Sequence, residues 1–242
     1  KKKNLFLSRD RFGSKPLYYF YNHKYFIFAS ELKAFMSLKK KIRPNFDEGI
    51  LLWMGKNYGS INTFLKNILL LPSGCQININ EKNNFYLKKW WRTCDHLIKV
   101  SKNYQDQVED FKQIFIESCK IRIRSDVPIA SCLSGGLDSS SVVSTISEIV
   151  NNKSNIERYN QKNQDIFFCE FSNDLNSEKS FANSVLEKYK NLKFNEVIID
   201  SNNISPDLIE ESQFYNEWID ADCVQLSMLY NKMKNKNIRV SL

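Results

Sequence analysis

One stretch decides the fold of this chain: Ser134-Gly135-Gly136-Leu137-Asp138-Ser139-Ser140. The apolar run before it, over 127–133, is typical of a short buried strand, and the apolar residues over 142–150 fall on one face of a helix. The stretch is therefore a loop between a strand and a helix. Its glycines let the backbone approach a ligand closely, and a helix N-terminus carries about half a positive charge. Such a loop suits a phosphate or pyrophosphate group.

The side chains of this loop narrow the chemistry. Serine hydroxyls add hydrogen-bond donors, whereas phosphate would repel Asp138 unless a cation lay between them, so we expect Asp138 to hold Mg²⁺. The loop is not a Walker phosphate loop, because no lysine follows the glycines. The alternative without a ligand is a Gly-Gly turn that carries a Ser or Asp helix cap.

Composition limits the classes of protein. The 242 residues suffice for one large domain or two small ones, and no apolar run approaches the roughly 18 residues of a membrane span. The six cysteines form no C-x-x-C pair, which predicts a reducing, cytoplasmic location and argues against a zinc site or disulfides. The net charge of +8 is spread along the chain without interleaved aromatic residues, so nucleic acid is not an expected partner.

The chain changes character near residue 92. Before it, short strands are predicted at 4–8, 17–21, 25–29 and 75–80, with a turn at 22–24 and short helices at 30–34 and 46–53. A linker over 92–103 follows. Beyond it, helices alternate with strands at 127–133, 166–171, 194–199 and 238–242, which predicts a parallel sheet with right-handed crossovers. Ligands of such sheets bind at the carboxyl ends of strands, where the Ser134–Ser140 loop falls.

The motifs together resemble one family. The loop resembles the PP-loop of ATP pyrophosphatases, which cleave ATP to AMP and pyrophosphate. Residues 8–19 and 28–34 resemble the R-D-R-x-G-x-K-P-L-Y-Y and F-A-S-E-x-K-A segments of asparagine synthetases, and 71–74 resembles their L-P-P-G turn. Residues 125–140 resemble their S-D-V-P…L-S-G-G-L-D-S-S. The order holds over nearly the whole chain, which is identified as a member of the glutamine-hydrolysing asparagine synthetase family.

This resemblance implies an α/β chain with two incomplete domains. Residues 1–91 would be the β-rich, C-terminal part of an N-terminal-nucleophile glutaminase (glutamine amidotransferase) domain, and 92–103 a linker. Residues 104–242 would be the N-terminal part of a parallel-sheet PP-loop synthetase domain, like the adenine nucleotide α-hydrolases. The family's catalytic amino-terminal Cys has no counterpart at Lys1, and its S-G-x-G-x-D-E loop would follow Leu242. No catalytic set is expected to be complete here, and the chain alone is expected to be inactive.

The implied reaction is ATP-dependent amide formation. A carboxylate, in the family that of aspartate, is activated as an acyl-adenylate with release of pyrophosphate, and ammonia from glutamine then attacks it. The implied site comprises a backbone contact of Leu133 with the nucleotide, a pyrophosphate cradle of Ser134, Gly135, Gly136, Ser139 and Ser140, Mg²⁺ on Asp138, and a backbone contact of Glu170 with adenine. ATP, Mg²⁺, glutamine or ammonia and the carboxylate are the implied ligands, and a homodimer is left open.

Three points stay open at this level. Residues 216–220 stand where family members carry a Glu-Pro-based segment, which leaves the carboxylate unassigned. Lasso-peptide cyclases and β-lactam synthetases are similar PP-loop enzymes that act on other carboxylates, and a non-catalytic ATP-binding descendant is the alternative of another class. Glu170 could equally be an ordinary residue at the end of a strand.

Overall fold

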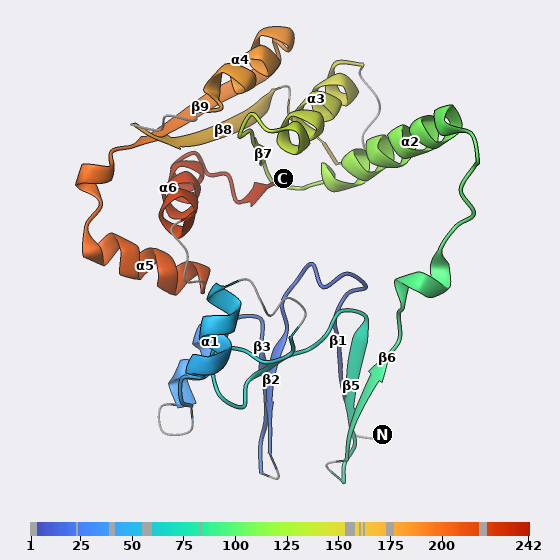
Figure 1. Ribbon diagram of the computed structural model, residues 1–242, viewed down its shortest axis with the longest axis vertical. Helices are drawn as coiled ribbons and strands as arrows, with labels where there is room; N and C mark the ends of the chain where they lie inside the picture. Colours follow the sequence, from blue (N-terminus) through green and yellow to red (C-terminus); the bar gives the residue numbers. More distant parts are fainter. Residues whose placement is uncertain are drawn as a thin grey trace. The chain divides into compact units, whose positions relative to one another are not determined.

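The computed structural model describes residues 4–22, 24–38, 42–54, 60–82, 84–152, 158–159, 161, 163–172, 177–217 and 222–242, without the side chains of 52 and 53. It divides into two compact units, Lys1–Lys99 and Val100–Leu242. Each unit is described by itself (Figure 1). Two predictions fall partly outside the described residues: the turn at 22–24, through His23, and the segment 216–220, through residues 218–220.

The first unit contains two antiparallel sheets of three strands each. The first has the order β1 (Leu5–Ser8), β5 (Cys75–Ile79) and β6 (Phe85–Lys89), and the second has the order β3 (Phe26–Ala29), β2 (Tyr18–Tyr21) and β4 (Leu69–Leu70). The strands predicted at 4–8, 17–21, 25–29 and 75–80 are confirmed to within a residue at each end. The strands β4 and β6 were not predicted. The ring of Tyr19 on β2 stacks on Phe85 of β6, with ring centroids 6.0 Å apart, and so joins the two sheets.

Two short helices complete this unit. The predicted helix over 46–53 is confirmed as α1 (Phe46–Trp53). The helix predicted at 30–34 is instead a 3₁₀ helix, η1 (Leu32–Leu38), whose Leu32 and Phe35 are buried. A spacing of three suits a 3₁₀ helix because residues i and i+3 lie directly above one another.

The predicted linker begins with a short helix, η2 (Thr93–His96). The ring of His96 stacks on Trp91 with centroids 3.7 Å apart, and the guanidinium carbon of Arg11 lies 4.5 Å from the Trp91 ring centroid. The carbonyl of Gly74 accepts hydrogen bonds from the amides of Trp90 and Trp91, at 2.8 and 3.1 Å. The two tryptophans thus tie the start of this segment to the first unit.

The second unit is built on a four-stranded parallel sheet, as predicted. The order is β10 (Val240–Ser241), β7 (Ile129–Cys132), β8 (Gln164–Phe171) and β9 (Leu192–Ile199). From β7 the chain moves outward to β8 and β9, and it then returns to place β10 on the other side of β7. The direction of winding therefore reverses at β7. The crevice outside the carboxyl ends of strands at such a reversal is where open α/β sheets bind ligands.

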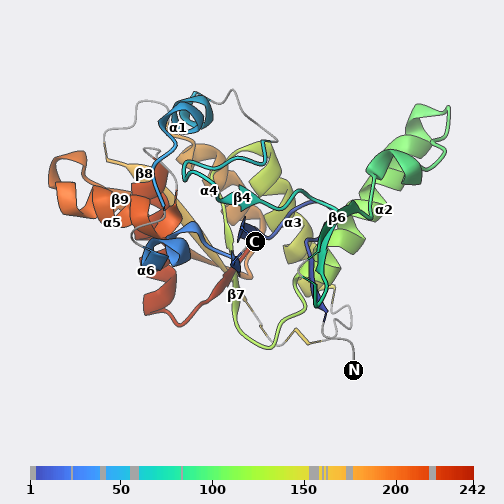
Figure 2. The same cartoon turned by 90° about the horizontal axis from the view of Figure 1, so that it is seen from below.

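Helices cover both faces of this sheet. The helices α3 (Leu137–Asn151) and α4 (Lys179–Lys188) lie on one face and α6 (Asp222–Asn235) on the other (Figure 1). Successive β8 residues alternate between the faces, since Ile166 and Phe168 pack with α3 and α4 whereas Phe167 packs with α6. The helix α5 (Pro206–Asn216) follows η3 (Ser201–Asn203) and lies beside α6 (Figure 2). Ser205 caps the start of α5: its Oγ accepts a hydrogen bond from the Leu208 amide.

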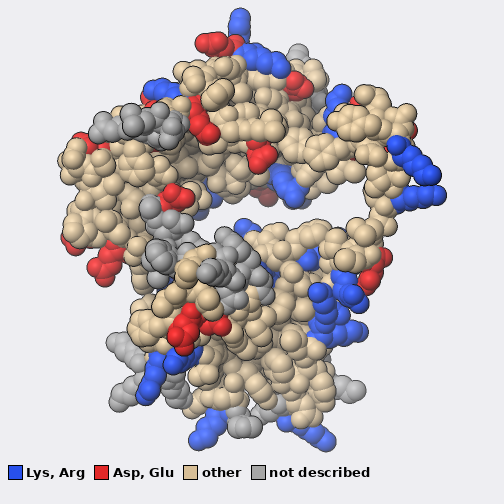
Figure 3. All heavy atoms as spheres, viewed as in Figure 1, with Lys and Arg blue, Asp and Glu red and all other residues tan. Residues whose placement is uncertain are grey.

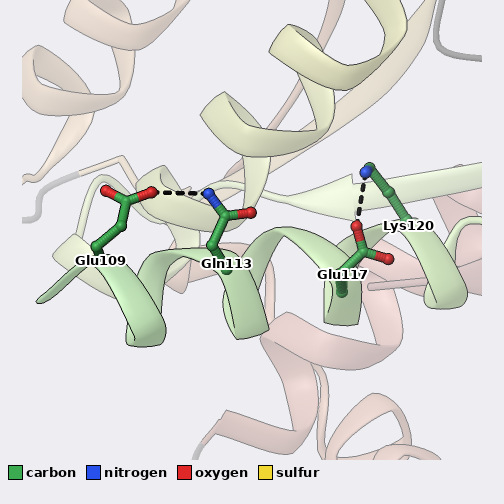
Figure 4. A network of polar contacts seen from close by, with 4 residues as sticks. All are labelled: Glu109, Gln113, Glu117 and Lys120. Carbon is green, nitrogen blue, oxygen red and sulfur yellow. Dashed lines mark hydrogen bonds and ion pairs between the residues drawn. The ribbon is translucent and has the colours of Figure 1, made fainter. Parts of the chain in front are cut away.

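The helix α2 (Tyr104–Arg122) packs against α3 through its C-terminal half. Cys119 is buried there, but Phe111, in the first half of the helix, is 69% exposed. On α4, Phe181 is likewise 64% exposed. Polar pairs one turn apart, Glu109–Gln113 and Glu117–Lys120, run along α2 (Figure 4). Such pairs each contribute a few tenths of a kcal/mol, about 0.2–0.5.

Charge is mixed over the surface. Acidic and basic side chains both occur on each unit, on the face that Figure 3 shows. Among the described residues, no helix has both the length and the apolar character that crossing a membrane would require.

Candidate nucleotide-binding site

The predicted phosphate loop leaves the sheet at the carboxyl end of β7. Leu133 extends the strand by one residue: it is 1% exposed, and its amide donates to the carbonyl of Phe167 on β8 at 2.9 Å. On the other side of β7, the amide of Cys132 donates to the carbonyl of Leu242 at 3.1 Å. The loop 134–136 thus lies at the carboxyl end of a strand, as predicted, and that strand is the one at which the winding of the sheet reverses.

Two serine hydroxyls shape the loop. The Oγ atoms of Ser134 and Ser139 lie 3.0 Å apart, and the Ser134 amide donates to the Oγ of Ser139 at 3.2 Å. The amide of Gly136 donates to the Oγ of Ser134 at 3.3 Å, and the Oγ of Ser139 donates to the carbonyl of Gly136 at 3.2 Å. These bonds draw the start of the loop onto the first turn of α3. Hydrogen bonds among the loop's own residues therefore stabilise its curved conformation.

The first turn of α3 is left open for a ligand. Its N-cap residue is Gly136, in an extended conformation (φ −65°, ψ 163°) that offers no side-chain cap. The first bond within the helix runs from the Ser140 amide to the Gly136 carbonyl, at 3.1 Å. The amides of Leu137, Asp138 and Ser139 precede that bond and so have no partner within the helix. Three N–H groups with the positive end of the helix dipole behind them suit an anion.

The two glycines serve different purposes. Gly135 has φ +101°, and an added Cβ would lie closer than 3.0 Å to the carbonyl oxygen of Glu178 and 3.0 Å from its Cβ, so only glycine fits. Gly136 has an ordinary φ, and within 4 Å an added Cβ would meet only the Oγ of Ser134, at 3.4 Å. Protein packing therefore explains Gly135. At Gly136 an added Cβ would instead meet open space apart from the Ser134 hydroxyl.

Asp138 is exposed in this first turn. Among the described residues, no cluster of three or more His, Cys, Asp or Glu side chains forms a metal cage. Mg²⁺ in nucleotide sites is commonly held by one or two carboxylates together with substrate phosphates and water. A single carboxylate beside a phosphate-binding loop fits this mode. The cation would neutralise charge on the phosphates.

Glu170 lies near the carboxyl end of β8, on the strand next to β7. Its carboxylate accepts a hydrogen bond from the hydroxyl of Ser177. The side chain is thus engaged within the protein, whereas the contact predicted for Glu170 is made by its backbone. That contact, and the ligand contacts predicted for the loop, stay predictions.

A hollow of about 700 Å³ lies between α2 and the N-terminal half of α3. Phe111 and Phe115 line it on the α2 side together with Lys112, and Asp138 and Ser140 line it on the α3 side. This volume is within the range of small-molecule sites. The first turn of α3, with Leu137, Asp138 and Ser140, therefore borders an open space.

Two thiols lie on the central strands of the sheet, Cys132 on β7 and Cys169 on β8. Burial raises the pKa of Cys132, and burial together with Cys132 and Glu170 raises that of Cys169 to about 11. Both thiols stay protonated at neutral pH, and the reactive form of cysteine is the thiolate.

In the first unit, the charges of the R-D-R segment hold a loop. The Arg9 guanidinium donates to the carbonyls of Leu71, Gly13 and Lys15, at 2.7 to 2.8 Å. The Asp10 carboxylate accepts from the amides of Phe12, Ser14 and Lys15. These bonds lower the pKa of Asp10 to about 2, chiefly through Ser14 and Lys15. Both side chains therefore stabilise the backbone of this loop.

Comparison with known proteins assigns the family. Residues 1–91 match the family model of a glutamine amidotransferase domain. Residues 110–242 match the asparagine synthase family model, which covers more than half of the chain. The chain belongs to the asparagine synthase family. The linker bounds 92–103 stay a prediction.

Individual relatives agree with this assignment. A putative glutamine-hydrolysing asparagine synthetase of Methanocaldococcus jannaschii is 37% identical over 61% of this chain, and one of Bacillus subtilis is 32% identical over 58%. An amidase of Penicillium rubens is 28% identical over 73%. The chain spans 29%, 20% and 26% of the lengths of these relatives.

One contact of the site was not predicted. The backbone of Glu178 contacts Gly135, but the sequence carries no signal for this contact, because Ser177-Glu178 is only a polar pair before a helix. Such a Ser-Glu pair is a common helix start. Its approach to a loop more than forty positions earlier depends on the parallel pairing of β7 with β8.

Proposed function

We propose that the protein containing this chain forms an amide at the expense of ATP, with aspartate as the carboxylate and ammonia from glutamine. The family supports an ATP-dependent amidotransferase function. The proposal includes activation of the carboxylate as an acyl-adenylate, Mg²⁺ on Asp138 and a cytoplasmic location. Whether the protein is a homodimer stays open.

One observation carries the proposal: a glycine-serine loop with three helix N–H groups free of helix partners stands at the winding reversal of a parallel sheet. Such a site binds the pyrophosphate part of a nucleotide better than a single phosphate, because its donors follow the chain from Gly135 to Ser139. Each charge-assisted hydrogen bond contributes roughly 1.5–3 kcal/mol.

The proposed reaction has two steps. A carboxylate oxygen attacks the α-phosphorus of ATP, and the bond from that phosphorus to the bridging oxygen breaks, with the electron pair leaving on pyrophosphate. Ammonia then attacks the acyl carbon, the bond to AMP breaks, and a proton passes to solvent. The loop amides would stabilise charge that develops on the leaving pyrophosphate. Asp138 would hold the cation that neutralises it.

A second carboxylate substrate is the competing candidate. The fungal amidase aligns with 73% of this chain, against 61% for the methanogen synthetase, although its identity is lower. The same adenylation chemistry would then act on a carboxylate other than aspartate, as in lasso-peptide cyclases or β-lactam synthetases. A panel of carboxylates in one assay separates these candidates.

The test is ATP–pyrophosphate exchange by the complete gene product, including any residues that flank this chain. Exchange should require a carboxylate, and the one that supports it fastest identifies the substrate. Asp138→Asn should abolish exchange, whereas Asp110→Asn, the same change at an exposed position of α2, should not alter it. Wild-type exchange rates in Asp138→Asn would refute the proposed role of this loop.

A further inference from the structure

The phosphate loop rests against the start of α4. The Gly135 backbone is so close to Glu178 that no side chain fits between them. Glu178 is the N-cap residue of α4, and its carbonyl accepts the amides of Phe181 and Ala182 at 3.0 and 3.1 Å. Ala182 is fully buried against the sheet. The surface that meets Gly135 is therefore a fixed part of the fold.

The residues on either side of Glu178 are anchored to two different strands. The hydroxyl of Ser177 donates to the Glu170 carboxylate on β8 and accepts the Lys179 amide at 3.3 Å. The ammonium of Lys179 forms an ion pair with Glu196 on β9. Residues 177–179 thus form a brace, with one anchor on each side of the residue that touches the loop.

We propose that Ser177 is a positioning residue for the nucleotide site, acting through Glu170 and the Glu178 backbone on Gly135. This inference rests on the proposed function and adds a residue of the β8–α4 connection to that site. The loop amides bind a pyrophosphate well only while they stay within about half an ångström of their bound geometry. Without its anchor on β8, the brace would let Gly135 move before a ligand arrives. Ordering the loop would then oppose binding.

The expected effect is specific for the hydroxyl. Ser177→Ala should weaken Mg²⁺-ATP binding about fivefold, the equivalent of about 1 kcal/mol, because the lost hydrogen bond is exposed. Ser177→Thr retains the hydroxyl and should restore binding. Ser180→Ala is the matched control, at an exposed position of the same helix.

The experiment compares these variants in the complete gene product. Calorimetric titration gives the Kd for Mg²⁺-ATP, and the kinetics of ATP–pyrophosphate exchange give kcat and the KM for ATP. Amide hydrogen exchange, measured without nucleotide, reports how well the amides of residues 134–139 are protected. Ser177→Ala should raise Kd and KM together, leave kcat nearly unchanged and speed hydrogen exchange in the loop. Ser180→Ala should change none of these values.

Two results would overturn the inference. The first is a Ser177→Ala protein whose Kd for Mg²⁺-ATP and whose rate of hydrogen exchange in the loop equal those of wild type. The second is a loss of affinity in Ser177→Ala that Ser177→Thr does not restore. Failure of the proposed function is separately visible, since the wild-type protein itself would then bind no ATP. Faster loop exchange in Ser177→Ala would, even then, show that the brace holds the loop.

Discussion

Substituting the two loop glycines by alanine should separate packing from ligand binding. Gly135→Ala places a methyl group closer than 3.0 Å to the Glu178 carbonyl oxygen, on a backbone with φ +101°. Left-handed strain costs about 1–3 kcal/mol, and overpacking adds about 1–3 kcal/mol. A total near 3 kcal/mol corresponds to a fall in Tm of roughly 6–12 °C for a unit of this size.

Gly136→Ala is the matched control for this change. Its φ is −65°, and its methyl group would meet only the Oγ of Ser134, at 3.4 Å. The unfolding temperature should stay near that of wild type, but Mg²⁺-ATP binding should fall at least tenfold because the methyl group occupies the ligand's space. Thermal unfolding and calorimetric titration of both variants measure the two effects. A Gly135→Ala protein as stable as wild type, or a Gly136→Ala protein that binds ATP normally, would refute this division of roles.

Two further predictions concern the titration of Asp10 and the accessibility of the thiols. Hydrogen bonds lower the pKa of Asp10 from 3.8 to about 2, so its stabilising effect is complete well above pH 3.8 and is lost as the pH falls towards 2. The difference in unfolding temperature between wild type and Asp10→Asn should therefore be largest at pH 6 and should shrink as the pH falls towards about 2. A difference that does not change with pH would contradict this. A thiol reagent should label exposed Cys94 first in the native protein, and buried Cys75, Cys119 and Cys223 only after unfolding. Mass mapping of the labelled peptides checks this order, and early labelling of Cys119 would show that α2 opens.

The site loop could be predicted because its signal is local. Ser134 to Ser140 carries glycine, serine and aspartate in an order that only a strand–loop–helix turn accommodates, and the apolar runs on both sides identify the strand and the helix. The parallel sheet followed from the alternation of such segments. The strand β6 was missed because four of its five residues are exposed and show no buried alternation.

Helical periodicity alone does not determine which apolar residues are buried. Phe111 and Phe181 have the spacing of core residues but are mostly exposed, because only part of α2 and one side of α4 meet another element. The Glu178 contact with Gly135 could not be read from the sequence, since it arises from the pairing of β7 with β8 and the direction in which α4 returns. Such contacts depend on tertiary structure rather than on residue type.

The most direct test of the central claim is to identify the nucleotide products of the complete gene product incubated with ATP, Mg²⁺, aspartate and glutamine. A loop that binds the leaving pyrophosphate requires cleavage between the α- and β-phosphates. The account predicts AMP and pyrophosphate in amounts equal to the amide formed, and no products from the Asp138→Asn variant. Formation of ADP and phosphate, or of amide without AMP, would contradict it.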